Sequence, residues 1–116
     1  MAPSPELEAR RAQERPIVVE PVETPPEVAA GRPVRLRFRL TDPATRAPVG
    51  GLEDVNVMTY RSPGNWQERR WARQVGEGIY EVEVVPPEPG NYRIAVECRS
   101  RKLLFHRSPQ IRLEAR

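Results

Sequence analysis

The stretch GIYEVEVVPPEPGNYRIAVEC, residues 78–98, decides the fold predicted for this chain. Apolar residues alternate with polar or charged ones on both sides of a proline-rich centre: Tyr80, Val82 and Val84 before it, and Tyr92, Ile94, Val96 and Cys98 after it. A period of two is typical of antiparallel strands that bury one face. The centre, Pro86 to Gly90, contains turn residues and ends the first strand. The stretch therefore predicts two half-buried strands joined at a proline and glycine corner.

The sequence on either side of this stretch continues the pattern. Val34, Leu36, Phe38 and Leu40 alternate with arginines, which predicts a half-buried strand, and Val55, Val57 and Thr59 alternate with Asn56, Met58 and Tyr60. Residues 66–75 are predicted to form a polar strand, and a last strand begins after residue 102 and is interrupted by Pro109. Turn residues separate the strands at intervals of about eight to twelve residues. The pattern predicts an all-β fold, an antiparallel immunoglobulin-like β-sandwich of about seven strands, with a closed barrel as the alternative.

The first thirty residues differ from the body of the chain. Residues 1–15 are charged, and they predict either a tail or a short helix that contains Leu7 as its only large apolar residue. Residues 16–30 are rich in proline, which confines them to an extended arm or an edge strand. We expect the sandwich to span residues 31–116. A further hypothesis is that the arm lies across a neighbouring subunit and becomes ordered there.

The charges of the chain are mixed in sign. There are 19 basic and 16 acidic residues, which gives a formal net charge of +3 at pH 7. The row Arg35, Arg37, Arg39 and the row Glu81, Glu83 are predicted to face each other on the solvent side of one sheet, which favours charge pairs over a polyanion site. No nucleic-acid partner is expected. No apolar run approaches the roughly 18 residues of a membrane helix, so we do not expect the chain to span a membrane.

The sequence contains no catalytic constellation, and we expect a protein that is not an enzyme and uses no cofactor. His106 is the only histidine and has no nucleophile motif beside it. Cys98 is the only cysteine, which excludes an intrachain disulfide. One alternative is a copper site formed by Cys98, His106 and Met58, since copper(I) favours these ligands. A lone inward cysteine ordinarily packs as a small hydrophobic residue, and no metal is the primary expectation.

The two tryptophans lie five positions apart in the predicted polar strand, so on a regular strand their side chains point to opposite faces. We expect Trp71 in the core and Trp66, beside a turn, at the surface. A bulge that lets both pack is the alternative. A docking patch for a protein partner is predicted from aromatic, apolar and arginine residues, which are typical of binding hot spots: Met58, Tyr60, Arg61, Trp66, Arg69 and Arg73.

Residues 78–98 also resemble the proline and glycine corner and the tyrosine-bearing strand of bacterial immunoglobulin-like and fibronectin-type-III-like domains. The resemblance implies that Tyr92 hydrogen-bonds back to the backbone and fixes the crossing between the two sheets. More narrowly, residues 31–113 are similar to modules found beside the β-propellers of nitrite-reductase-like and YVTN-repeat proteins, and more distantly to YtkA-like domains. Residues 51–55 and 66–80 carry this closer resemblance.

The resemblance implies an interaction or accessory module that docks onto a larger protein or assembly. The partner it implies is a propeller or redox protein of a bacterial envelope, which places the chain in the periplasm or cell envelope, although its first residues lack the pattern of a signal peptide. Two alternatives remain open. One is a small periplasmic domain that handles copper or another metal, and the other is a structural subunit that decorates a filament or particle.

Overall fold

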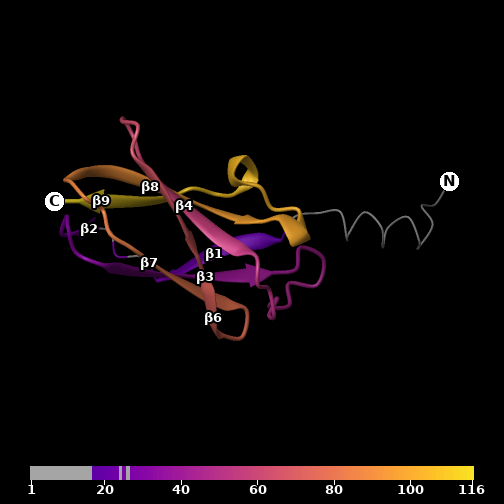
Figure 1. Ribbon diagram of the computed structural model, residues 1–116. Helices are drawn as coiled ribbons and strands as arrows, with labels where there is room; N and C mark the ends of the chain where they lie inside the picture. The colour runs from indigo at the N-terminus through magenta and orange to yellow at the C-terminus, as the bar shows by residue number, and fades with distance from the viewer. Residues whose placement is uncertain (1–16, 24, 26) are drawn as a thin grey trace.

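The chain forms two β-sheets that pack face to face (Figure 1). A computed structural model describes residues 17–23, 25 and 27–116, and of Glu23 and Arg107 it describes the backbone alone. The predicted helix or tail of residues 1–15 lies outside the described residues. The strands are β1 (Val18–Glu23), β2 (Glu27–Val28), β3 (Val34–Thr41), β4 (Val55–Arg61), β5 (Gln67–Trp71), β6 (Arg73–Gly76), β7 (Ile79–Val84), β8 (Gly90–Cys98) and β9 (Ile111–Ala115).

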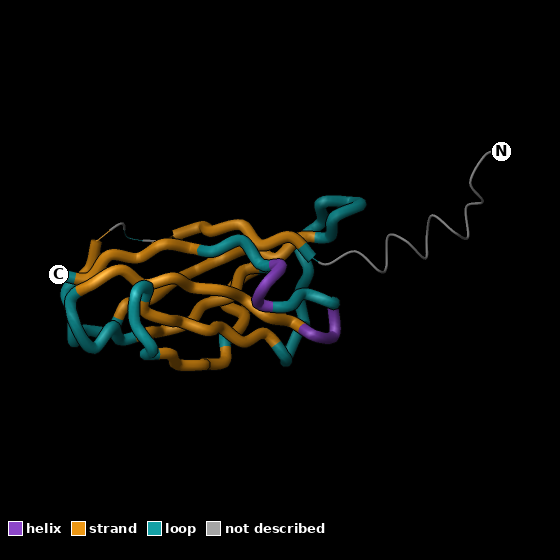
Figure 2. The backbone as a smooth tube through the Cα atoms, turned by 90° about the horizontal axis from the view of Figure 1, so that it is seen from above, coloured by secondary structure: helices purple, strands orange, loops and turns teal. Residues whose placement is uncertain are grey.

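The predicted all-β sandwich is confirmed. One sheet has the strand order β1-β3-β7-β6 and the other has the order β2-β9-β8-β4-β5. Every pair of described strands is antiparallel except β2 with β9. The strands run along the length of the molecule (Figure 2). Because each sheet ends in its own edge strands, the described residues do not form a closed barrel.

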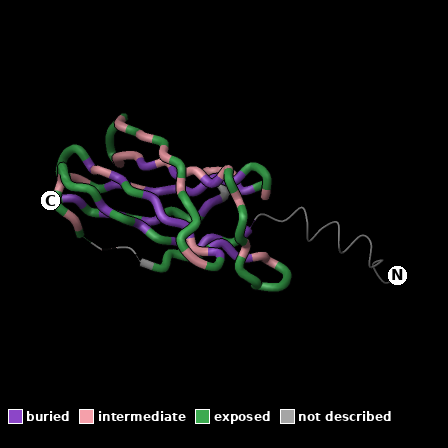
Figure 3. Tube along the Cα trace, turned by 60° about the horizontal axis from the view of Figure 1, so that its bottom comes forward, coloured by how far each residue is buried: buried purple, intermediate pink, exposed green. Residues whose placement is uncertain are grey.

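The core lies between the sheets and consists of the inward residues that the period of two predicts. Buried and exposed residues alternate strictly along most of β3, and the same alternation is visible along other strands in Figure 3. The largest fully buried apolar side chains are Tyr80, Tyr92, Phe38, Leu36, Leu40, Ile94, Leu103, Leu113, Val55, Val57 and Val96. Full burial of such a side chain contributes about 1.5–3 kcal/mol, so this layer is the main source of stability.

The outer face of the four-stranded sheet carries a ladder of opposite charges, as predicted. Arg35 lies opposite Glu83, and Arg37 lies opposite Glu81. The Nε of Arg37 donates to Glu81 Oε2 at 2.9 Å, and Arg73 on β6 approaches the other carboxylate oxygen of Glu81 at 3.4 Å. The hydrogen bond from Arg37, helped by Arg73 and opposed by burial, holds the pKa of Glu81 below its ordinary value. Of the arginine row, Arg37 is therefore held in an ion pair, and Arg35 lies across from an acidic residue.

The first described strands belong to both sheets. Within residues 16–30, predicted as an arm or an edge strand, β1 pairs with β3 at one edge of the four-stranded sheet. The chain then passes to the other sheet, where β2 pairs in parallel with β9. The backbone N–H of Arg116 donates to the carbonyl of Val28 at 2.9 Å. The two sheets are therefore joined through this segment at their edges.

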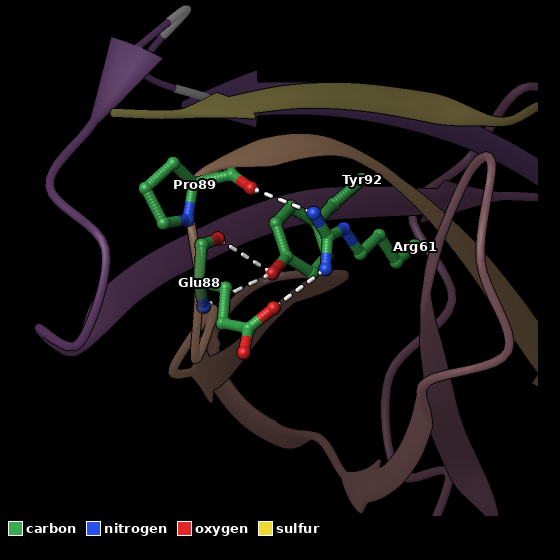
Figure 4. Close-up of polar contacts among 4 residues, drawn as sticks. All are labelled: Arg61, Glu88, Pro89 and Tyr92. Carbon is green, nitrogen blue, oxygen red and sulfur yellow. Dashed lines mark hydrogen bonds and ion pairs between the residues drawn. The ribbon is translucent and has the colours of Figure 1, made fainter.

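The corner between β7 and β8 is fixed by a tyrosine and an arginine (Figure 4). The Tyr92 hydroxyl donates to the carbonyl of Glu88 at 2.7 Å, which is the hydrogen bond that the resemblance implies. Arg61 donates to the carboxylate of Glu88 at 2.7 Å and to the carbonyl of Pro89 at 3.1 Å. Gly90 has a φ of 151°, and a Cβ there would lie 3.0 Å from Nε of Arg61. The positive φ therefore favours glycine at this position, where the Arg61 side chain also lies close to the backbone.

The polar segment of residues 66–75, predicted as one strand, is two strands in different sheets. β5 pairs with β4, whereas β6 pairs with β7. Between them, Ala72 packs against the core, and its N–H donates to the carbonyl of Val55 at 2.9 Å. The prediction failed because this segment has few apolar residues, and a polar edge strand gives no signal when the chain changes sheets.

The last predicted strand is also shorter than expected. Residues 99–107 include two short 3-10 helices, η1 (Arg99–Arg101) and η2 (Phe105–Arg107), and only Ile111–Ala115 form β9. Pro109 cannot donate to a strand ladder. In place of a ladder bond, the N–H of Val96 donates to the hydroxyl of the buried Ser108 at 3.1 Å. The segment before β9 therefore folds over β8 instead of extending along it.

Candidate docking surface

A hollow of about 330 Å³ lies on the outer face of the five-stranded sheet. Its walls come from β4, from the turn before β5, from β8 and from the segment around η2. The lining residues are Met58, Tyr60, Arg61, Gly64, Asn65, Trp66, Gln67, Ala95, Phe105, His106 and Gln110. Four of these are half-buried aromatic or apolar side chains, Met58, Tyr60, Trp66 and Phe105, and polar side chains surround them. This combination is typical of sites that take a ligand or a partner side chain.

The residues at the centre of this hollow are outward-facing residues of neighbouring strands. Met58 and Tyr60 are outward residues of β4, because Val57 and Thr59 point into the sandwich. Met58 lies between Arg69 of β5 and Ala95 of β8, and these three side chains share one face. The small side chain of Ala95 leaves room that the neighbouring segment around Phe105 borders but does not fill.

The side chains of Tyr60 and Phe105 are fixed by contacts with neighbouring residues. The amide of Gln110 donates to the Tyr60 hydroxyl at 2.6 Å, and Arg93 donates to the amide oxygen of Gln110 at 2.9 Å. The guanidinium carbon of Arg69 lies 4.9 Å from the centre of the Phe105 ring. Such a cation–π contact contributes about 0.5–1 kcal/mol at an exposed site. The aromatic walls are thus positioned by their own neighbours.

Four of the six predicted docking residues line the hollow together, namely Met58, Tyr60, Arg61 and Trp66. Arg69 borders it through its contact with Phe105. Arg73 does not belong to this group, because β6 lies in the other sheet, where Arg73 approaches Glu81.

Sequence reasoning missed Phe105, Gln110 and Ala95. The first two come from the segment that was assigned to a strand, and Pro109 is the one signal in it against regular pairing. Ala95 sits at an outward position of a strand, where a single alanine carries no information about a hollow.

The assignment of the tryptophans was reversed. Trp71 is 70% exposed and is not a core residue, whereas Trp66 is half-buried against the core. The reason is strand parity: Arg70 lies opposite the inward Val57, so Trp71 shares the outward face with Asn56. The Trp66 ring meets the ring of Tyr92 edge-on, with centroids 5.6 Å apart and an angle of 86°. Trp66 is therefore in part a structural residue.

A second hollow, of about 450 Å³, lies further along the same face. Its lining residues are Asp54, Asn56, Arg69, Arg70, Trp71, Glu97 and Arg99. Arg69 lines this hollow and stacks on Phe105, which lines the first, so its side chain stands between the two. We call the surface formed by both hollows the docking face.

The three residues of the alternative copper site are not brought together. Cys98 is fully buried and faces the core opposite Val55, whereas Met58 lies on the outer face of the sheet. His106 is exposed in η2. The Cys98 sulfur donates to the carboxylate of Asp54 at 3.3 Å, and burial raises the pKa of the thiol. Among residues 17–23, 25 and 27–116 there is no group of three or more His, Cys, Asp or Glu side chains placed to hold a metal ion.

The carboxylate of Asp54 is engaged at the end of β8. It accepts hydrogen bonds from the backbone N–H of Ser100 at 2.8 Å and from the Ser100 hydroxyl at 2.7 Å. Burial acts to raise the pKa of Asp54, but the two hydrogen bonds from Ser100, together with that from Cys98, hold it below its ordinary value. Asp54 therefore stays ionised and fixes the turn after β8.

No helix in the described part of the chain has the length and apolar character needed to cross a membrane.

The sheet orders and the tyrosine corner define an immunoglobulin-like β-sandwich. No family model matches the chain, and no curated protein matches it. Among solved structures it is similar to the Lin-41 filamin domain, with 13% identity, a TM-score of 0.56, and coverage of 83% of this chain and 91% of that domain. It is also similar to a superoxide reductase (neelaredoxin) from Ignicoccus hospitalis, with 11% identity, a TM-score of 0.51, and coverage of 97% and 89%.

At such identities the two likenesses bear on the fold alone. The filamin domain agrees with the immunoglobulin-like class. Neither structure is a nitrite-reductase-like, YVTN-repeat or YtkA-like protein, so the finer resemblance stays a prediction.

Proposed function

We propose that the protein is a non-enzymatic interaction module that binds a protein partner through the docking face. The observation that carries this proposal is the open, largely apolar hollow around Met58, Tyr60 and Phe105, with the exposed Trp71 further along the same face. Aromatic residues, methionine and arginine are enriched in protein interfaces, where they supply most of the binding energy. An exposed group of such residues on a sheet face is typical of an interaction site.

The ionisable groups favour binding over catalysis. In the described part of the chain, pKa values depart from their ordinary range at Asp42, Asp54, Glu81 and Cys98. Asp42 accepts hydrogen bonds from the backbone N–H groups of its own turn. Glu81 is held by Arg37 and Arg73 of its own four-stranded sheet, which does not carry the docking face. Asp54 lines the second hollow, and the other three line neither hollow. Catalytic groups with perturbed pKa values would instead converge in one cleft.

The partner class remains the one that the sequence resemblance implies, a larger protein of a bacterial envelope such as a propeller or redox protein. The filamin domain with the same fold supports a role in interaction only by analogy, because a fold does not determine a function.

A pull-down from the source cells tests the proposal, with the unaltered chain, Tyr60→Ala and Val75→Ala as baits. Tyr60 is in the first hollow, whereas Val75 is an apolar residue, 42% exposed, on β6 of the other sheet. We expect a partner that binds the unaltered chain and Val75→Ala but is lost with Tyr60→Ala. Thermal melts of all three proteins check that they are folded. Equal recovery with both variants would contradict docking at this face.

A further inference from the structure

We infer that the docking face recognises an extended acidic peptide segment that carries a large apolar side chain. This inference rests on the proposed docking function and names the chemistry of the partner. It is argued from the charges on the face, from their internal partners and from the spacing of the two hollows.

The first hollow has aromatic and apolar side chains among its walls and no acidic residue in its lining. Arg61 and His106 are its ionisable basic residues, and Arg69 stands at its border. The Arg61 guanidinium already forms an ion pair with the carboxylate of Glu88, which lies in the β7–β8 corner. A partner side chain that enters this hollow therefore meets aromatic walls and a cationic rim.

Arg69 is an arginine on the docking face that lacks an acidic partner among the described residues. Its side chain is exposed and lies over the Phe105 ring, and within the described residues no carboxylate oxygen lies within 4.0 Å of it. The neighbouring Arg70 differs, since it forms an ion pair with Glu68. A guanidinium that stacks on a ring keeps N–H donors at its edges, and a carboxylate is the group that these donors bind best.

The acidic residues of the second hollow are already engaged. Asp54 accepts two hydrogen bonds from Ser100. Glu97 is 6% exposed and forms an ion pair with Arg99 at 3.4 Å. Neither carboxylate is placed to neutralise Arg69. The charge that the face presents to a partner is therefore positive, and it complements an acidic segment.

The spacing of the hollows fits an extended chain. Outward residues of β4 run from Tyr60 at the first hollow, through Met58 opposite Arg69, to Asn56 opposite Trp71. Four residues of a strand cover about 13 Å. In an extended peptide every second side chain points to the same side. A large apolar residue in the first hollow thus places the residue two positions away at Arg69, and that residue should be Asp or Glu.

The test is selection from a random dodecamer library displayed on phage, with the full chain as target. The enriched sequences should combine a large apolar residue with an acidic residue two positions away. A synthetic copy of an enriched peptide should bind about tenfold more weakly to Arg69→Glu, as expected for reversal of a charge-assisted contact. Tyr60→Ala should weaken it similarly. Arg32→Glu is the matched control, since it makes the same charge change in the exposed loop before β3 and should leave affinity unchanged.

Several results would overturn the inference. These are enrichment of peptides without acidic residues, binding that is insensitive to Arg69→Glu, or no enrichment. If a single-stranded oligonucleotide displaces the peptide, and its binding is weakened equally by Arg69→Glu, the face binds polyanions in general and not an acidic peptide. A native partner that is captured through Tyr60 but indifferent to Arg69→Glu would leave the docking function standing and reject only its acidic chemistry.

Discussion

Replacing each tryptophan by alanine gives the sharpest test of the structure, because the two side chains differ so much in burial. Trp66 is half-buried and edge-on to Tyr92, whereas Trp71 is 70% exposed. An aromatic side chain buries about 150–250 Å² when packed, so a half-buried one removes about 100 Å² from water, equivalent to about 2.5 kcal/mol. The edge-to-face pair adds about 0.5–1.5 kcal/mol. Trp66→Ala should therefore cost about 3 kcal/mol.

Trp71→Ala should cost less than about 1 kcal/mol, as is usual for a surface substitution. For a chain of this length, about 4 °C of melting temperature corresponds to 1 kcal/mol, so we expect losses of about 12 °C for Trp66→Ala and under about 4 °C for Trp71→Ala. Differential scanning calorimetry measures both. Fluorescence gives an independent check, because the tryptophan left in Trp66→Ala should emit as a solvent-exposed indole. Equal losses, or a larger loss for Trp71→Ala, would refute the strand parity of β5.

Three further predictions concern other parts of the sandwich. Tyr92→Phe should lower the free energy of unfolding in urea by about 1–2 kcal/mol, because the Glu88 carbonyl loses its hydroxyl donor; a variant as stable as the original would show that the corner does not depend on this bond. The pKa of Glu81 lies below its ordinary value of 4.5 because of Arg37. The stability that the ionised Glu81 carboxylate contributes is therefore fully present above the unfolded-state pKa and is lost as pH falls through the folded-state pKa. In Glu81→Gln, the free energy of unfolding measured by urea titration should therefore fall less steeply below about pH 4. An unchanged pH profile would count against this charge pair. Burial raises the pKa of Cys98, so a disulfide reagent at pH 8 should modify it only as fast as the protein opens, and rapid modification of the native protein would contradict its placement.

The parts of the fold that could be predicted are those where one face of a strand differs chemically from the other. On β3, arginine alternates with buried apolar residues, and this pattern fixes both the strand and the face it buries. The segment from Gln67 to Gly76 has no such contrast, so neither the change of sheets at Ala72 nor the direction of Trp71 could be predicted.

The candidate site was predictable to a similar extent. Met58 and Tyr60 stand out in the sequence because they are large residues at outward strand positions. Phe105 and Gln110 do not, because their place depends on how the segment around η2 folds over β8. That path is set by tertiary contacts such as the bond between Val96 and Ser108, which leave no period in the sequence.

The position of the strand ends determines how the sandwich resists a pulling force. Val18 pairs with Thr41 at one end of the molecule, and Ala115 pairs with Gly90 at the other. Tension between these two ends acts along the strands, while the antiparallel hydrogen bonds of β1 with β3 and of β8 with β9 lie across it. All bonds of a strand pair are then loaded together in shear instead of opening one after another. We therefore expect the module to resist tension along this line better than tension across the strands.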